Sequence, residues 1–155
     1  MKAGWIIAAA ILLFIPGAGA ISAPGDACTL LTDAQVSMAL GVTVSPGTPI
    51  GAPTSCQWAG KGKIATLTAN NVIQGKTALD RFEPGKTPIP GIAIQPVSGV
   101  GDDAYYVTYA GTTRAGMGLV VKKGTSAFEV RVYGFDNEPA KPVAKTLALI
   151  VAGKF

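Results

Sequence analysis

Three short segments near the C-terminal end restrict this chain to one kind of fold. Residues 104–110, 117–124 and 126–135 are rich in β-branched and aromatic residues, and Gly-containing turns separate them. In the last segment Phe128, Val130 and Val132 alternate with more polar residues, which is the period of a strand with one buried face. Strands joined by such short turns pair antiparallel, so the pattern predicts an antiparallel sheet.

The preceding residues predict two helices and a hairpin. A capping box of Thr32 and Gln35 with a closing Gly41 predicts a helix over residues 33–40. Strands are expected at residues 55–60 and 64–73, and the Pro- and Gly-rich residues 42–54 are expected to be a surface connection.

The second helix is expected within residues 75–85. Thr77 is suited to cap it, Pro84 to follow its end, and Leu79 and Phe82 lie three residues apart on one face. We therefore expect both apolar side chains to point into the core.

The final helix is predicted to start at Asp136 or Asn137 and to end at Gly153. Its apolar stripe is predicted to consist of Val143, Leu147, Ile150 and Val151. These elements predict a single α+β domain with an antiparallel sheet of five to six strands. The expected order is α-β-β-α-β-β-β-α, with the helices packed on one face of the sheet.

The first 20 residues have the pattern of a secretory signal peptide. Lys2 supplies the positive end, residues 4–15 are apolar, and the Ala-Gly-Ala of residues 18–20 is a typical cleavage site. The apolar run is shorter than the roughly 20 residues that a membrane-spanning helix needs. We expect cleavage to leave residues 21–155 as one exported domain, secreted or periplasmic, without a stable membrane anchor.

Composition removes several classes of function. The predicted mature chain has 12 Lys and Arg against 9 Asp and Glu, a formal charge of +3 that is scattered along the sequence, so we expect no nucleic-acid partner. The chain has no histidine, which rules out Ser-His-Asp and Cys-His catalysis and the usual zinc sites. The sequence therefore predicts no catalytic residues, no bound metal and no cofactor.

Cys28 has three interpretations: a lipid anchor, a reactive thiol, or half of a disulfide. Lipidation would need the apolar run directly before the cysteine, but Asp26 stands between them. A reactive thiol would need a positive setting, whereas Asp26 and Asp33 flank Cys28. We favour a structural disulfide with Cys56, since two cysteines in an exported chain form an even set.

The acidic turn at residues 98–106 is the stretch that most resembles a functional motif. Asp102 and Asp103 are neighbours, so their side chains should point to opposite sides of the extended chain and not converge on a ligand. Turn chemistry accounts for the glycines and aspartates.

The tyrosines and one arginine are the candidate binding surface. In an extended chain Tyr105 and Tyr109 share one face and Tyr106 takes the other, while Arg131 and Tyr133 point away from the apolar side of their strand. One of these tyrosine sets is expected to line a wet sheet face with Arg131. The alternative is that the tyrosines only pack across strands.

Several short motifs together resemble an uncharacterised family of bacterial secreted proteins and lipoproteins that is common in actinobacteria. The resemblance rests on "CTLLTDAQVSMALG", "CQW", "GVGDDAYY", "GLVVKKGTSAFEVRV" and the closing "AKTLALIVAGKF". Many relatives carry a separate lipid-anchoring cysteine before the domain, and this chain departs from them there. The resemblance implies no established activity.

These observations leave three hypotheses of different classes. The first is a non-enzymatic exported domain that binds an envelope protein or a small ligand through an exposed sheet face. The second is a small hydrolase that uses carboxylates, and the third is an inhibitory or structural module. Two carboxylates converging in a pocket would favour the enzyme, and an open tyrosine-rich face would favour binding.

Overall fold

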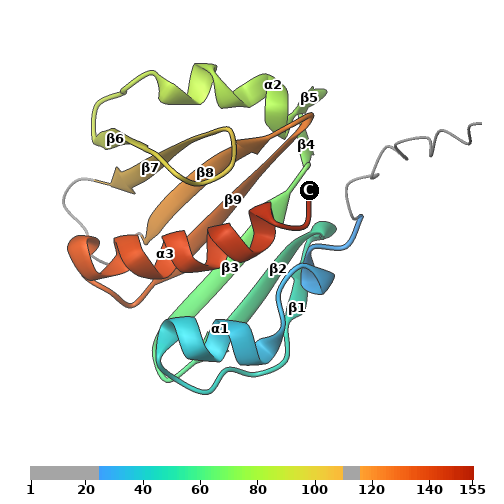
Figure 1. Ribbon diagram of the computed structural model, residues 1–155, viewed down its shortest axis with the longest axis vertical. Coiled ribbons are helices and arrows are strands. Elements are labelled where there is room, and N and C mark those ends of the chain that lie inside the picture. The colour runs from blue at the N-terminus through green and yellow to red at the C-terminus, as the bar shows by residue number, and fades with distance from the viewer. Residues whose placement is uncertain (1–24, 110–115) are drawn as a thin grey trace, which may run out of the picture.

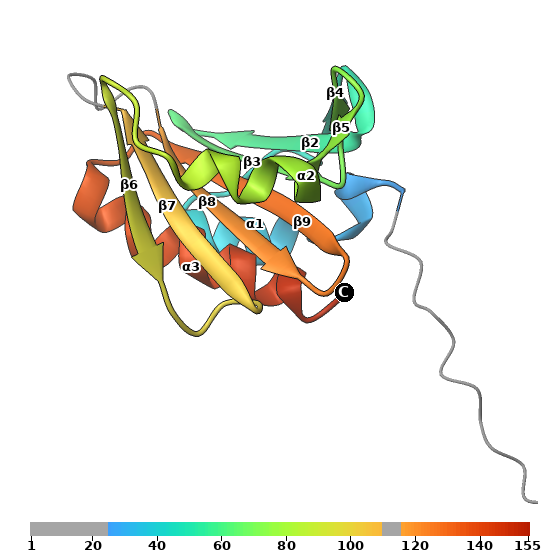
Figure 2. The ribbon, with the colours of Figure 1, turned by 90° about the horizontal axis from the view of Figure 1, so that it is seen from above.

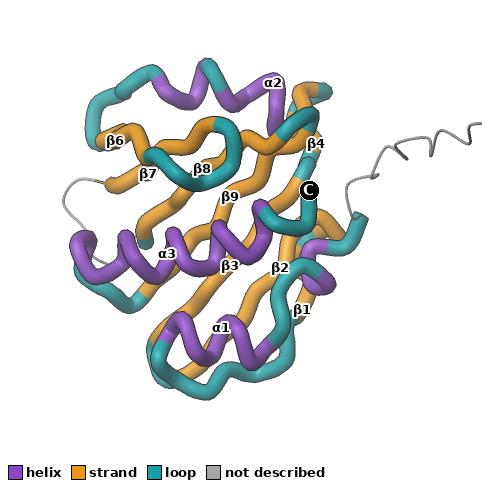
Figure 3. The backbone as a smooth tube through the Cα atoms, viewed as in Figure 1, coloured by secondary structure: helices purple, strands orange, loops and turns teal. Residues whose placement is uncertain are grey.

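The computed structural model describes residues 25–109 and 116–155, and the predicted signal peptide lies outside these ranges. Its centre is an antiparallel sheet of seven strands in the order β1-β2-β3-β9-β8-β7-β6 (Figures 1 and 3). The strands are β1 (Thr48–Ile50), β2 (Ala52–Gly60), β3 (Lys63–Ala69), β6 (Ile92–Val97), β7 (Asp103–Tyr109), β8 (Met117–Lys123) and β9 (Ser126–Tyr133). A separate two-stranded ribbon consists of β4 (Val72–Ile73) and β5 (Lys76–Thr77).

The helices lie on both sides of this sheet, which corrects the prediction that they share one face. They are the 3-10 turns η1 (Ala27–Thr29) and η2 (Pro84–Lys86) and the helices α1 (Asp33–Leu40), α2 (Ala78–Phe82) and α3 (Asn137–Ala152). Figure 2 shows α1 and α3 along one side of the sheet, and α2 packs on the other face, where Phe82 contacts Tyr105 and Ala127. The α+β class is therefore confirmed, while the sheet is larger than predicted and the element order has more strands.

The first helix begins and ends where the sequence predicts. The Thr32 hydroxyl accepts a hydrogen bond from the Gln35 amide at 3.2 Å, and the Gln35 side chain accepts one from the Thr32 amide at 2.9 Å. Gly41 ends the helix with a φ of 66°, a left-handed conformation that glycine adopts at little cost.

The main core lies between the sheet and the helices α1 and α3. Trp58, Leu67 and Phe128 are among the largest fully buried side chains from the strands. In α3, Leu147 and Val151 are fully buried as predicted, whereas Val143 and Ile150 are only partly buried. Four alanines complete the buried side of α3 instead: Ala140, Ala144, Ala148 and Ala152.

The predicted disulfide is confirmed. Cys28 in η1 is bonded to Cys56 in β2 with an S–S distance of 2.01 Å, so the bond ties the start of the fold to the second strand. It is consistent with an oxidising, extracytoplasmic environment. No helix within residues 25–109 and 116–155 is long and apolar enough to cross a bilayer.

Both outer strands of the sheet contain a proline. Pro49 lies in β1, within the segment predicted to be a surface connection, and Pro96 lies in β6, which the predicted order omits. Proline removes a backbone donor and is tolerated on edge strands, where one side of the backbone needs no partner. The Pro- and Gly-rich composition therefore concealed the two edge strands.

The helix α2 forms a second, smaller core on the opposite face. Thr77 caps it as predicted, in a capping box with Asp80. Phe82 is buried, but against Tyr105 and Ala127 and not in the main core, and Leu79 packs beside it. The sequence thus identifies the apolar side of α2 correctly but not the sheet face that it covers.

Candidate functional site

A shallow groove lies on the α2 side of the sheet, across β1, β2, β3 and β9. We call the sheet surface that contains this groove the open face. The groove has a volume of about 360 Å³. The residues that line it are Ile50, Ser55, Gln57, Ile64, Thr66, Thr68, Glu129, Arg131 and Tyr133.

Strand alternation explains why this face is polar. In β3, the buried Ala65 and Leu67 point toward α1 and α3, so Thr66 and Thr68 point the other way. The same alternation in β2 buries Cys56 and leaves its neighbours half-buried on the open face. The alternation of the strands alone therefore places polar side chains on this face.

The register of the strands arranges these side chains in rows. One row consists of Gln57, Thr66 and Arg131, which are direct neighbours across β2, β3 and β9. In the next row, the hydroxyls of Ser55 and Thr68 lie 3.0 Å apart and hydrogen-bond each other, with Glu129 beside Thr68. Each row thus crosses the groove and presents hydrogen-bonding groups at a spacing of one strand.

Arg131 is the centre of the most organised part of the open face. Its Nε and Nη2 donate hydrogen bonds to Glu129 Oε1 at 3.0 and 2.5 Å, and its Nη1 donates to the Tyr109 hydroxyl at 3.0 Å. Burial lowers the pKa of Arg131, but the charge and hydrogen bonds of Glu129 outweigh this effect, so the pKa is raised overall. The guanidinium is therefore charged and held in a fixed orientation at every physiological pH.

Gly118 makes room for this cluster. It lies in β8 between Tyr109 and Arg131, and it is the direct cross-strand neighbour of Arg131. A Cβ at this position would collide with the Glu129 carboxylate. The missing side chain lets Tyr109 reach over β8, where its ring lies 5.0 Å from the guanidinium carbon.

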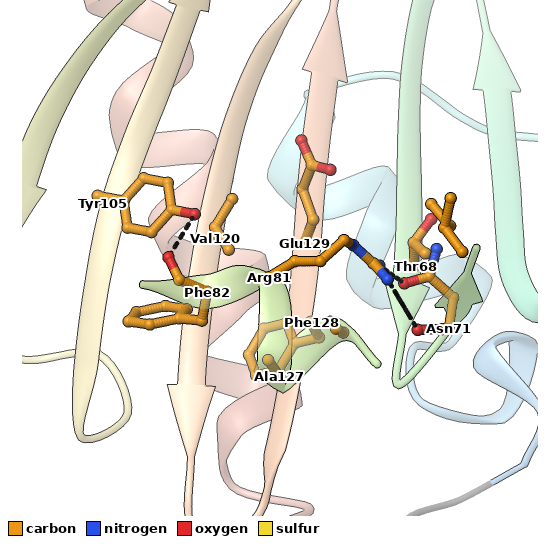
Figure 4. Close-up of a pocket in the computed structure, with 11 residues that line it drawn as sticks. Thr68, Asn71, Arg81, Phe82, Tyr105, Val120, Ala127, Phe128 and Glu129 are labelled. Atoms are coloured by element: carbon orange, nitrogen blue, oxygen red, sulfur yellow. Dashed lines mark hydrogen bonds between the residues drawn. The ribbon is translucent and has the colours of Figure 1, made fainter. Parts of the chain in front are cut away.

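A deeper pocket of about 220 Å³ adjoins the open face beneath α2 (Figure 4). It shares Thr68 and Glu129 with the groove and is otherwise lined mainly by α2, β7, β8 and β9. Arg81 extends across it from α2, and its Nη2 donates to Asn71 Oδ1 at 2.5 Å while its Nη1 donates to the carbonyl of Lys76. Arg81 therefore links α2 to Asn71, which follows β3, and to Lys76 in β5.

The predicted binding surface is only partly assembled by the fold. Tyr109, Arg131 and Tyr133 lie on the same side of the sheet, and Arg131 and Tyr133 line the groove itself. Tyr105 is 4% exposed beneath α2, and its hydroxyl donates to the Phe82 carbonyl at 3.2 Å. Tyr106 is 7% exposed on the other face, where its hydroxyl donates to the carbonyl of Lys141 in α3.

Tyr105 and Tyr106 are therefore not part of the binding surface, contrary to the prediction, because helices cover both of them. Burial raises the pKa of Tyr105 to about 12. The sequence prediction missed Glu129, although its position two residues before Arg131 in an alternating strand places both on one face.

The two aspartates of the acidic turn diverge as predicted. Asp102 accepts from the Gly124 amide at 2.7 Å and from Lys123 at 3.1 Å, whereas Asp103 pairs with Lys86 at 2.5 Å. These hydrogen bonds lower the pKa of both carboxyls. Both side chains therefore fasten the turn to neighbouring elements, and neither faces the groove.

The carboxylate of the groove, Glu129, is engaged by Arg131 through two hydrogen bonds. Across residues 25–109 and 116–155, no three acidic, cysteine or histidine side chains are arranged to hold a metal ion. The site offers hydrogen-bond donors and acceptors at fixed positions on adjacent strands. No protein-family model, curated protein or solved structure matches the chain.

Proposed function

We propose that residues 21–155 form an exported, non-enzymatic domain that binds a partner on the open face. The observation that carries the proposal is the row of Gln57, Thr66 and Arg131 on the floor of a solvent-accessible groove. Sites that recognise ligands combine a concave surface with a few polar groups in fixed positions. The groove of the open face has both properties.

The fixed position of Arg131 supports a binding role. Its guanidinium has five N–H donors, of which three are engaged by Glu129 and Tyr109 within the described residues. Ordering a long side chain at an interface usually costs about 0.5–1.5 kcal/mol, and here that cost is met before a partner arrives. A partner would therefore meet a surface that is already shaped for it.

Export is part of the proposal. It rests on the signal pattern of residues 1–20 and on the disulfide between Cys28 and Cys56. Disulfides persist in secreted and periplasmic proteins and are rare where thiols are kept reduced. A binding face of this kind would then be displayed outside the cytoplasm.

The test uses one variant on the open face and one matched control. Thr66→Arg places a long side chain in the middle of the groove, while Met38→Arg makes a similar change at an 83% exposed position of α1, on the opposite side of the sheet. The wild-type domain and both variants are immobilised and exposed to the extracytoplasmic fraction of the source organism. Circular dichroism first establishes that all three are folded.

We expect the wild type and Met38→Arg to retain the same component and Thr66→Arg to retain at least tenfold less. Equal retention by all three proteins would contradict binding on the open face. A wild-type domain that retains nothing would contradict the proposed function as a whole.

A further inference from the structure

The charges that line the groove cancel within the site. Glu129 and Arg131 are its charged side chains, and they are bonded to each other. An anionic group would have to compete with Glu129 for the guanidinium, and a cationic group would have to compete with Arg131 for the carboxylate. Either competition leaves a half-buried charge with less compensation, so the groove favours a ligand without net charge.

The remaining polar groups are hydroxyls and an amide. Ser55, Gln57, Thr66 and Thr68 each donate and accept hydrogen bonds, and they lie in adjacent rows. A ligand with many hydroxyl groups would match them, since every hydroxyl is also both donor and acceptor. The two N–H donors of Arg131 outside its described bonds lie in the same row as Gln57 and Thr66.

Apolar side chains complete the groove. Ile50 and Ile64 line it together with Tyr133, which packs beside Ile64 across β3 and β9. A tyrosine combines an apolar ring with a polar hydroxyl. This mixture suits a ligand whose rings have C–H faces and hydroxyl edges, which is the chemistry of a sugar.

From these observations we infer that the partner of the open face is a neutral oligosaccharide. The inference rests on the proposed function and names its ligand class. The groove volume of about 360 Å³ lies in the range of small-ligand sites, roughly 300–1,000 Å³, and suits a short run of sugar rings. Its shallow, open form suits a chain that continues past the site at either end.

Arg81 at the adjoining pocket is a positive charge that could attract an acidic sugar, so it allows neutral and acidic ligands to be compared. Its hydrogen bonds within the described residues go to neutral oxygens of Asn71 and Lys76, whereas Arg131 is hydrogen-bonded to a carboxylate. An acidic sugar polymer would exploit this charge, and a neutral one would not. Binding of neutral and acidic oligosaccharides of equal length therefore separates the two.

The experiment titrates the isotope-labelled domain, residues 21–155, with four hexasaccharides. Three are neutral, made of glucose, mannose or N-acetylglucosamine, and the fourth is hexagalacturonate. Backbone amide shifts in β2, β3 and β9 report binding on the open face. We expect at least one neutral probe to shift these amides and hexagalacturonate to bind at least tenfold more weakly.

Two matched glutamine variants then locate the site. Gln57→Ala removes an amide from the floor of the groove, and Gln95→Ala removes an exposed amide from the edge strand β6. Affinity for the neutral probe should fall at least fivefold in Gln57→Ala and stay within twofold of wild type in Gln95→Ala. Equal losses in both variants would overturn the assignment to the open face.

Tighter binding of hexagalacturonate, or no shift with any neutral probe, would overturn the oligosaccharide inference. The immobilised-domain test shows whether the proposed function falls with it. If Thr66→Arg abolishes retention of a protein there, the open face binds a partner but not a sugar. If that test also shows no retention, the inference and the proposed function both fail.

Discussion

The indole nitrogen of Trp58 donates a hydrogen bond of 2.9 Å to Asp33 Oδ1. The same oxygen accepts from the amide of Gly47 at 3.0 Å. One carboxylate therefore joins the first turn of α1, the strand that carries Cys56 and the loop before β1. Gly47 fits here because a Cβ would strike the indole.

Asp33→Ala should lower the free energy of unfolding by about 1–3 kcal/mol. Trp58 is 1% exposed, and an indole N–H left without its acceptor carries the desolvation cost of a buried donor. Urea denaturation followed by tryptophan fluorescence measures the change. Asp136→Ala is the control, since Asp136 precedes α3 without a capping side-chain bond, and an equal loss there would contradict this role of Asp33.

Removing the disulfide should cost more than any single hydrogen bond. The cysteines are 28 residues apart, and closing a loop of this size stabilises a protein by about 3–4 kcal/mol in the chain-entropy model. The double variant Cys28→Ala with Cys56→Ala should unfold at correspondingly lower urea concentration. Non-reducing mass spectrometry of the wild type should show two hydrogens fewer than the reduced chain, and free thiols would disprove the bond.

Gly118→Ala should disturb the open face more than the stability of the domain. The added Cβ displaces the Glu129 carboxylate, which is the flexible end of a side chain, and so weakens its bonds to Arg131. The Nε–H signal of Arg131 in a proton–nitrogen spectrum should shift and exchange faster with water. Gly25→Ala meets no neighbouring atom and should leave the signal unchanged; an unchanged signal in Gly118→Ala would contradict the described packing.

Alkaline titration should reveal Tyr105 as a late step. Burial raises its pKa to about 12, so the folded state favours the neutral phenol. This contribution to stability is complete below the ordinary tyrosine pKa of about 10 and is lost as the pH rises through about 12. Absorbance at the phenolate band should show a step near pH 12 that is missing in Tyr105→Phe and in urea-unfolded protein; persistence of the step in Tyr105→Phe would refute the assignment.

Acid should weaken the turn that Asp102 and Asp103 fasten. The pKa of Asp102 is lowered by the Gly124 amide and Lys123, and that of Asp103 by Lys86. Their contribution to stability is therefore present above the ordinary aspartate pKa of about 4 and is lost as the pH falls below it. Between pH 5 and pH 2, the double variant Asp102→Asn with Asp103→Asn should lose less free energy of unfolding than wild type, as measured by urea denaturation. An equal loss in both proteins would contradict the stabilising role of the two carboxylates.

Sequence patterns predicted the structure correctly where all the residues that form the pattern belong to one helix or strand. The capping box of Thr32 and Gln35 needs only four neighbouring residues, and so it fixed α1 at both ends together with Gly41. The cysteine pairing needed no geometry, because the chain has two cysteines and each has the other as its one possible partner. Alternation likewise placed Arg131 and Tyr133 on one face of β9.

The sequence was less informative where elements had to be placed relative to each other. The spacing of Leu79 and Phe82 shows which side of α2 is apolar, but either face of the sheet would bury that side. For the same reason the sequence did not show which tyrosine set would be covered, since the helices that cover Tyr105 and Tyr106 come from other parts of the chain. The cluster around Arg131 also depends on Tyr109, which lies two strands away.

The prolines of the two outer strands restrict how other proteins can approach this domain. A strand added to β1 or β6 would extend the sheet through backbone hydrogen bonds, but Pro49 and Pro96 each interrupt the row of donors. Unregulated self-association through sheet edges is disfavoured for the same reason. Contacts that use side chains on the faces of the sheet are not restricted in this way.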